Sequence, residues 1–247
     1  YPVIFDGRKT QSWGMTALIV GARKEAGGGV REGWSVFRGT QNLVGLFSFE
    51  DNTAPKPEEI LDKRGIFDDY NGKCNYQITT GVVGNFDTEG WGVIKYTNLT
   101  STGEPGQDVL WVDTDFPLFR LGDVYLMYAE AVARGGEGGD ISTAVGYVNE
   151  LRDRAYGETP HNKIDAAWLT ANNYQNILDE RGRELYWEGV RRIDLIRFGK
   201  YTSSSYTWPA KGGVITGVGV NERYNIFPIP ISDISVNGSL EQNEGYK

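Results

Sequence analysis

Cysteine and histidine are almost absent from this chain, which has one of each among its 247 residues, Cys74 and His161. A single cysteine cannot form an internal disulfide, and one cysteine with one histidine cannot build a zinc cage. Neither residue lies in a recognisable nucleophile motif, so thiol–imidazole catalysis has no support. We therefore expect no metal site and no catalytic residue.

Basic runs and long apolar runs are also missing. The chain has 25 Lys and Arg against 33 Asp and Glu, a net charge of -8, whereas a nucleic-acid binder needs a basic face. The longest apolar stretch, around residues 17–20, is far shorter than the roughly 20 residues that span a bilayer. Glycine clusters at 27–29 and 135–139 lack the P-loop lysine and the dinucleotide-binding spacing. No nucleic-acid partner and no cofactor are expected.

Aromatic residues and glycine are abundant, with 7 Trp, 14 Tyr, 10 Phe and 33 Gly. Residues 1–115 are rich in both and poor in helical periodicity. Short candidate strands at 17–20, 77–80 and 93–96 and one candidate helix within 40–49 are separated by loops. Long loops in a compact protein commonly carry binding residues. We therefore predict a loop-rich first region that carries the ligand surface.

Residues 116–247 are predicted to be mainly helical. Pro117 opens a run whose apolar positions recur at helical spacing, at Leu121, Val124, Tyr125, Tyr128, Ala129 and Val132. A second helix is expected from a cap at Asp140 or Ser142 to a stop at Gly157. The two form a hairpin of tetratricopeptide length, and one such unit needs partner helices to bury both faces.

A third helix is expected to start after Thr170 and to run to about Phe198. Gly182 lies inside it and costs about 1 kcal/mol relative to alanine, so close packing or a kink must compensate. Residues 225–231 contain two prolines without amide donors, which is typical of an extended segment at an edge or on the surface.

Several sequence blocks occur in a characteristic order. They are FPLFRLGDVYLMYAEA at 116–131, VNELRDRA at 148–155, ILDER with ELYWEG at 177–189, RIDLIRFGK at 192–200, FPIP at 227–230 and QNEGY at 242–246. In these blocks the chain resembles the SusD/RagB family of Bacteroidetes outer-membrane nutrient-binding lipoproteins. Gly182 departs from the family's larger residue, which is often Arg.

The resemblance implies a mainly α-helical, SusD-like fold with tetratricopeptide-type helices. It also implies an outer-membrane, cell-surface protein that captures glycans for import through a SusC-like TonB-dependent transporter. The family's membrane anchor is an N-terminal lipidated cysteine, which Cys74 is not because it is internal. Residues 1–7 read as a strand that runs into a turn, so we interpret the chain as a C-terminal portion without the family's N-terminal tetratricopeptide part.

Sugars offer CH-rich faces and hydroxyl groups, so glycan sites favour flat aromatic side chains edged by polar groups. Trp168 and Trp187 lie in or beside predicted helices and are expected to pack. The candidate glycan-binding residues lie in loop-like contexts with polar neighbours, and they are Trp13, Trp34, Tyr70, Trp91 and Trp208.

Two alternatives accompany the glycan-binding hypothesis. The chain could serve as a transporter lid that binds peptide or another nutrient. It could also be a glycoside hydrolase, because Glu180, Glu184 and Glu188 share one helix face. Arginines interleaved at helical spacing argue against hydrolysis, since pairs such as Glu188–Arg192 and Asp194–Arg197 are typical of an ion-paired helix.

Overall fold

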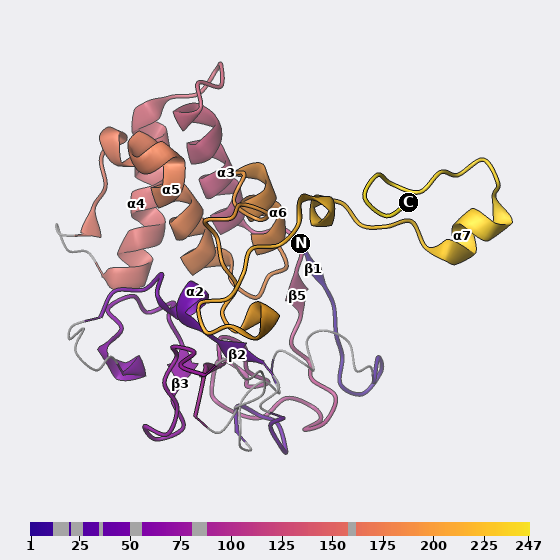
Figure 1. The fold of residues 1–247 in the computed structure, drawn as a ribbon. Coiled ribbons are helices and arrows are strands. Elements are labelled where there is room, and N and C mark those ends of the chain that lie inside the picture. The colour runs from indigo at the N-terminus through magenta and orange to yellow at the C-terminus, as the bar shows by residue number, and fades with distance from the viewer. Residues whose placement is uncertain (12–19, 21–26, 35–36, 50–55, 81–87, 158–161) are drawn as a thin grey trace. The chain divides into compact units, whose positions relative to one another are not determined.

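The computed structural model describes residues 1–11, 20, 27–34, 37–49, 56–80, 88–157 and 162–247 (Figure 1). The chain forms two compact units, the first made of residues 1–79 and 84–191 and the second of residues 80–83 and 192–247. Among the described residues, no helix combines the length and the apolar composition needed to cross a membrane. Each unit is described by itself.

Short strands organise the loop-rich part of the first unit. Strands β1 (Pro2–Val3) and β5 (Phe116–Pro117) pair antiparallel, and a three-stranded antiparallel sheet has the order β2 (Arg38–Gly39), β4 (Trp91–Val93), β3 (Phe67–Asp68). A 3₁₀ turn, η1, spans Pro57–Glu59. The predicted helix within 40–49 is confirmed as α2 (Gln41–Val44).

Of the three predicted strands, one is shifted, one lies largely outside the described residues and one is wrong. The strand predicted at 93–96 lies earlier, as β4, and residues 17–19 of another lie outside the described residues. The strand predicted at 77–80 is wrong, because side chains take the hydrogen bonds that a neighbouring strand would supply. The amide of Ile78 donates to Gln41 Oε1 at 3.1 Å, and that of Thr79 donates to Glu89 Oε1 at 2.7 Å.

An aromatic core holds the sheet to the end of the third long helix. Its buried members are Val44, Phe47, Phe67, Tyr70, Cys74, Trp91, Val93 and Tyr186. The rings meet edge to face, with Tyr76 and Trp91 centroids 5.0 Å apart and those of Phe47 and Tyr186 5.9 Å apart. The Tyr186 hydroxyl donates to the Arg64 carbonyl at 2.5 Å, so the core joins the loop-rich region to the helices.

Helices α3 (Leu121–Ala133), α4 (Ile141–Tyr156) and α5 (Ala166–Leu185) complete the first unit. Helix α3 packs against both α4 and α5, and the three lie together in Figure 1. The predicted hairpin is confirmed: Asp140 caps α4 by accepting from the Thr143 amide at 2.7 Å, and Gly157 ends it at φ 82°.

The buried face of α3 differs from the predicted one. Leu126 and Ala129 are fully buried, whereas Leu121 and Val124 are 61% and 48% exposed. The apolar residues of α3 occupy more of its circumference than α4 and α5 cover. The helical spacing of apolar residues therefore predicts burial correctly at Ala129 and incorrectly at Leu121 and Val124.

The third predicted helix is interrupted twice. Inside α5 the backbone departs from helical geometry over residues 171–174, where Asn172 and Asn173 have φ of 52° and 53°. The helix ends at Leu185, and Trp187 and Gly189 adopt φ of 63° and 79° before α6 (Arg191–Arg197) begins. The prediction of one helix to Phe198 is therefore wrong.

Gly182 is explained by close packing. A Cβ at this position would lie 2.6 Å from Leu46 Cδ1 and 2.9 Å from Arg191 Nη1. Only a residue without a side chain allows the loop after α2 to approach α5 this closely.

The second unit contains α6 from Arg192 onward, 3₁₀ turns η3 (Lys211–Gly213) and η4 (Glu222–Asn225), and α7 (Ile231–Val236). Residues 226–230 between η4 and α7 have no regular secondary structure, in agreement with the predicted proline-containing extended segment. The Arg192 guanidinium packs over the rings of Phe227 and Tyr201, 4.2 and 5.0 Å from their centroids.

Candidate functional site

Glu180 and Glu184 lie one turn apart on α5, and Glu188 follows three residues beyond its end. Their exposed fractions are only 0%, 2% and 8%. A buried carboxylate needs cationic partners, because an isolated buried charge is strongly unfavourable. Arginines and a lysine from other segments supply them, and together these side chains form the buried charge network.

Glu184 is held by three arginines. Arg64 Nη1 donates to its Oε2 at 2.8 Å, Arg120 Nη1 donates to Oε1 at 2.5 Å, and Arg154 Nη2 donates to both oxygens at 2.6 Å. Burial raises the pKa of Glu184, but the hydrogen bonds from Arg154, Arg120 and Arg64 outweigh it and bring the pKa to about 2. Glu184 is therefore ionised at neutral pH.

Glu180 occupies a similar arginine cage. Arg152 Nη1 and Arg183 Nη2 donate to its Oε2 at 2.8 and 2.7 Å, and Arg64 Nη2 lies 2.8 Å from Oε1. The Arg64 guanidinium also donates two hydrogen bonds to the Asp62 carboxylate, at 2.9 and 2.6 Å. Burial raises the pKa of Glu180, and the attraction of Arg183, Arg64 and Arg152 overcomes this and lowers it to about 2.

Glu188 completes the network through long-range contacts. Lys95 Nζ donates to its Oε1 at 2.5 Å, and Arg120 donates to both oxygens through Nε and Nη2 at 2.5 and 2.8 Å. The predicted Asp194–Arg197 pair forms at 2.9 Å. Glu188 is thus engaged by residues distant in sequence, and the predicted Glu188–Arg192 pair, which would join the two units, stays a prediction.

This network is unsuited to acid catalysis. A glycosidase needs a carboxylic acid whose pKa is raised so that it can protonate the leaving group. Glu180 and Glu184 instead have lowered pKa values, and their oxygens accept from arginines. The carboxylates join α5 to α3, α4 and the loop-rich region.

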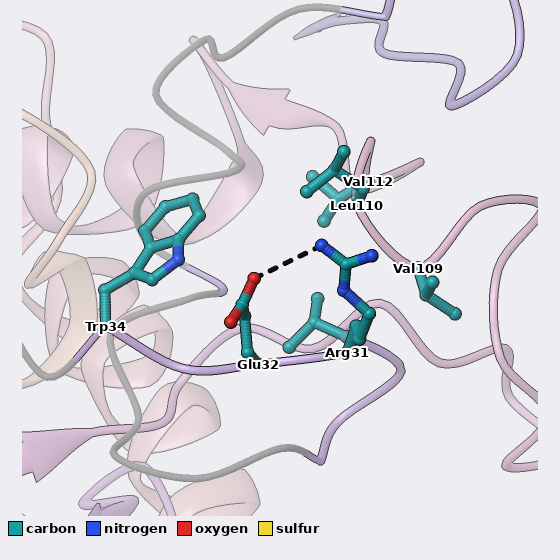
Figure 2. Close-up of a pocket in the computed structure, with 7 residues that line it drawn as sticks. Arg31, Glu32, Trp34, Val109, Leu110 and Val112 are labelled. Atoms are coloured by element: carbon teal, nitrogen blue, oxygen red, sulfur yellow. Dashed lines mark hydrogen bonds and ion pairs between the residues drawn. The ribbon is translucent and has the colours of Figure 1, made fainter.

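Among the predicted glycan-binding residues, Trp34 lies in the first unit, and its side chain is partly exposed. Figure 2 shows it beside a small hollow of about 10 Å³, which is lined by Val30, Arg31, Glu32, Trp34, Val109, Leu110 and Val112. An ion pair of 3.3 Å joins Arg31 and Glu32. The hollow is too small for a sugar ring, and the surface around it consists of the exposed Arg31 and Glu32 side chains and the partly exposed Trp34.

Asn98 holds the loops that carry this surface. It is 3% exposed, its Nδ2 donates to the Gly29 and Asp108 carbonyls at 3.1 and 2.8 Å, and its Oδ1 accepts from the Asp113 amide at 2.9 Å. The Arg31 amide donates to the Val109 carbonyl at 3.0 Å. These bonds fix residues 29–31 against 108–113 and so support Trp34.

Two other candidates are corrected by their burial. Trp91 is 1% exposed and donates from Nε1 to the Cys74 carbonyl at 2.9 Å, and Tyr70 is 5% exposed in the same core. Neither ring presents a face to a ligand, because both are buried in the aromatic core. Trp13 lies outside the described residues.

Trp208 belongs to the second unit. It is half-buried, with Tyr206 and Tyr201 centroids 5.2 and 5.8 Å away in edge-to-face contact. Its amide donates to the Val218 carbonyl at 3.2 Å, which pins the loop. Sequence reasoning missed the two tyrosines, although their spacing of two and seven residues from Trp208 was available as a signal.

Packed helices joined to an aromatic, loop-rich region define the fold of the first unit. The SusD family model matches residues 68–246, and the chain belongs to the SusD family. It is 34% identical over 281 aligned residues to the starch-binding protein SusD of Bacteroides thetaiotaomicron, an alignment that covers 100% of this chain and 48% of that protein.

Solved structures support the same fold. Surface glycan-binding protein A from Bacteroides thetaiotaomicron has a TM-score of 0.64 and 20% identity, with 99% of this chain and 51% of that chain covered. A SusD superfamily protein from Bacteroides fragilis has a TM-score of 0.59 and 19% identity, with 100% and 51% covered. The predicted SusD-like, mainly α fold is confirmed, and the chain spans about half the length of these relatives.

Proposed function

We propose that this chain is part of a cell-surface protein that captures glycans without hydrolysing them. The observation that carries the proposal is the 34% identity, along the whole chain, to a relative named as a starch-binding protein. The paired, low-pKa state of Glu180 and Glu184 supports binding over hydrolysis.

The glycan surface in this proposal centres on Trp34. A half-exposed indole offers a flat face for a sugar ring, and Arg31 and Glu32 beside it supply polar edges for hydroxyl groups (Figure 2). Trp13 remains a proposed contributor within residues 1–115. Trp208, in the 201–220 loop of the second unit, is proposed to contact glycan in its own right.

The partner in this proposal is a SusC-like TonB-dependent transporter in the outer membrane. Membership of the SusD family supports this assignment. Membrane attachment would then come from the N-terminal lipid anchor that the family resemblance implies. Co-purification of the full-length protein with its transporter tests this part.

Binding of the purified chain to soluble starch and a panel of other glycans tests the central claim. We expect Trp34→Ala to weaken binding of a recognised glycan about tenfold or more, as for other aromatic binding hot spots. Phe119→Ala is the matched control, because Phe119 is 65% exposed and lies outside the surface around Trp34. Absence of binding to every glycan tested, with binding to a peptide library in a parallel assay, would contradict the proposal.

A further inference from the structure

A second, larger cavity lies over the buried charge network. It has a volume of about 390 Å³ and is bounded by the 63–66 loop, residues 95–96, residues 117–120, α4 and the end of α5. That volume falls within the range of about 300–1,000 Å³ typical of small-molecule sites. The cavity shares no lining residue with the hollow beside Trp34.

The charges around this cavity do not cancel. Two carboxylates, Glu184 and Glu188, face five cationic side chains, which are those of Lys63, Arg64, Lys95, Arg120 and Arg154. The remaining acids of the network, Asp62 and Glu180, are matched in number by Arg152 and Arg183. A positive surplus is therefore concentrated in a chain whose net charge is -8.

Two groups at the cavity retain hydrogen-bond donors that a ligand can reach. Within the described part of the chain, the Lys63 ammonium is exposed and makes no hydrogen bond or ion pair, and Arg154 uses only Nη2 while its side chain is 56% exposed. A bound anion would accept from both without displacing a contact of the fold.

Apolar groups form the rest of the wall. Ile66, Pro117 and the Tyr96 ring line the cavity together with the cationic groups. A bare inorganic ion would leave these surfaces unused, whereas a small organic anion would contact them. The Lys63 amide donates to the Ala155 carbonyl at 2.9 Å, which fixes Lys63 next to Arg154.

We propose that this cavity binds a sugar carboxylate, with Lys63 and Arg154 facing its charge and the Tyr96 ring among the apolar groups that line the site. The ligand is a uronate, either as a free sugar acid or as an acidic unit of a longer glycan. The site stands apart from the surface around Trp34 and does not depend on it.

Calorimetric titration of the whole chain tests the site, with D-glucuronate, the neutral sugar D-glucose and a trigalacturonate as probes. We expect glucuronate to bind at least about tenfold more tightly than glucose, because charge-assisted hydrogen bonds are the stronger ones. Lys63→Gln should weaken glucuronate binding by about three- to tenfold. Lys73→Gln is the control, since Lys73 is exposed and does not line the cavity.

Lys63→Gln removes no contact of the fold, and its melting curve verifies this. Tighter binding of trigalacturonate than of glucuronate would assign the site to acidic glycans, and the reverse would assign it to free sugar acids. The proposal is overturned if glucuronate binds no better than glucose, or if Lys63→Gln behaves like Lys73→Gln. Trp34→Ala is expected to leave glucuronate affinity unchanged. The proposal for this cavity and the proposal for the surface around Trp34 can therefore be refuted separately.

Discussion

Arg64 and Glu184 form a buried ion pair across 120 residues of sequence, with Arg64 Nη1 donating to Glu184 Oε2 at 2.8 Å. The two side chains are 10% and 1% exposed. Arg64 belongs to the loop-rich region and Glu184 to α5, so this contact joins the two sequence regions within one compact unit.

Glu184→Gln should destabilise the protein. The amide would carry no charge among Arg64, Arg120 and Arg154, and breaking a buried ion pair from one side costs about 3–5 kcal/mol. Urea denaturation followed by circular dichroism measures the free energy of unfolding.

Glu137→Gln is the matched control, because Glu137 is exposed in the α3–α4 link and should change stability by no more than about 0.5 kcal/mol. Equal stability of the two variants would show that the network contributes nothing. Reducing-sugar release by the parent protein that Glu184→Gln abolished would instead favour the hydrolase hypothesis.

Stability should fall at acid pH through Glu180 and Glu184. Their folded pKa values of about 2 lie below the ordinary 4.5, so their contribution is complete above pH 4.5 and is lost as the pH falls toward 2. The loss should be on the order of 2–3 kcal/mol per carboxylate. Melting temperatures between pH 2 and 6 measure it, and a flat profile over that window would refute the pairing.

Gly182→Ala should destabilise α5 although alanine is the better helix former. The new Cβ would meet Leu46 and Arg191 at 2.6 and 2.9 Å, and overpacking of this kind costs about 1–3 kcal/mol. Gly146→Ala in α4 is the control, because a Cβ there meets nothing within 4 Å and should stabilise by about 1 kcal/mol. The melting temperatures of both variants test this prediction. A Gly182→Ala variant that is more stable than the parent protein would contradict the packing argument.

Trp91→Ala is expected to lower the stability of the protein without removing a glycan contact. Removal of this 1% exposed ring from the aromatic core should cost about 3–5 kcal/mol in the free energy of unfolding. Trp34→Ala should cost little stability and should reduce glycan binding instead. Paired denaturation and binding assays test the contrast, and loss of binding in Trp91→Ala at full stability would restore Trp91 as a ligand residue.

The fold was predictable where local signals agree with one another. The Asp140 cap, the apolar spacing of α4 and the Gly157 stop all point to the same helix, and the structure contains it. The break between α5 and α6 was not predictable, because residues 186–190 carry a helix-compatible pattern. Positive φ at Trp187 and the packing of Tyr186 into the aromatic core end the helix there.

The sequence by itself determined the family and the helical hairpin, because these depend on residue types and local spacing. Only the tertiary structure decided which aromatic residues are exposed, since Trp91 and Trp34 have similar loop-like surroundings in sequence but differ in what packs over them. It also decided the partners of Glu180, Glu184 and Glu188. Their arginines come from segments as far as 120 residues away, and folding alone brings such segments together.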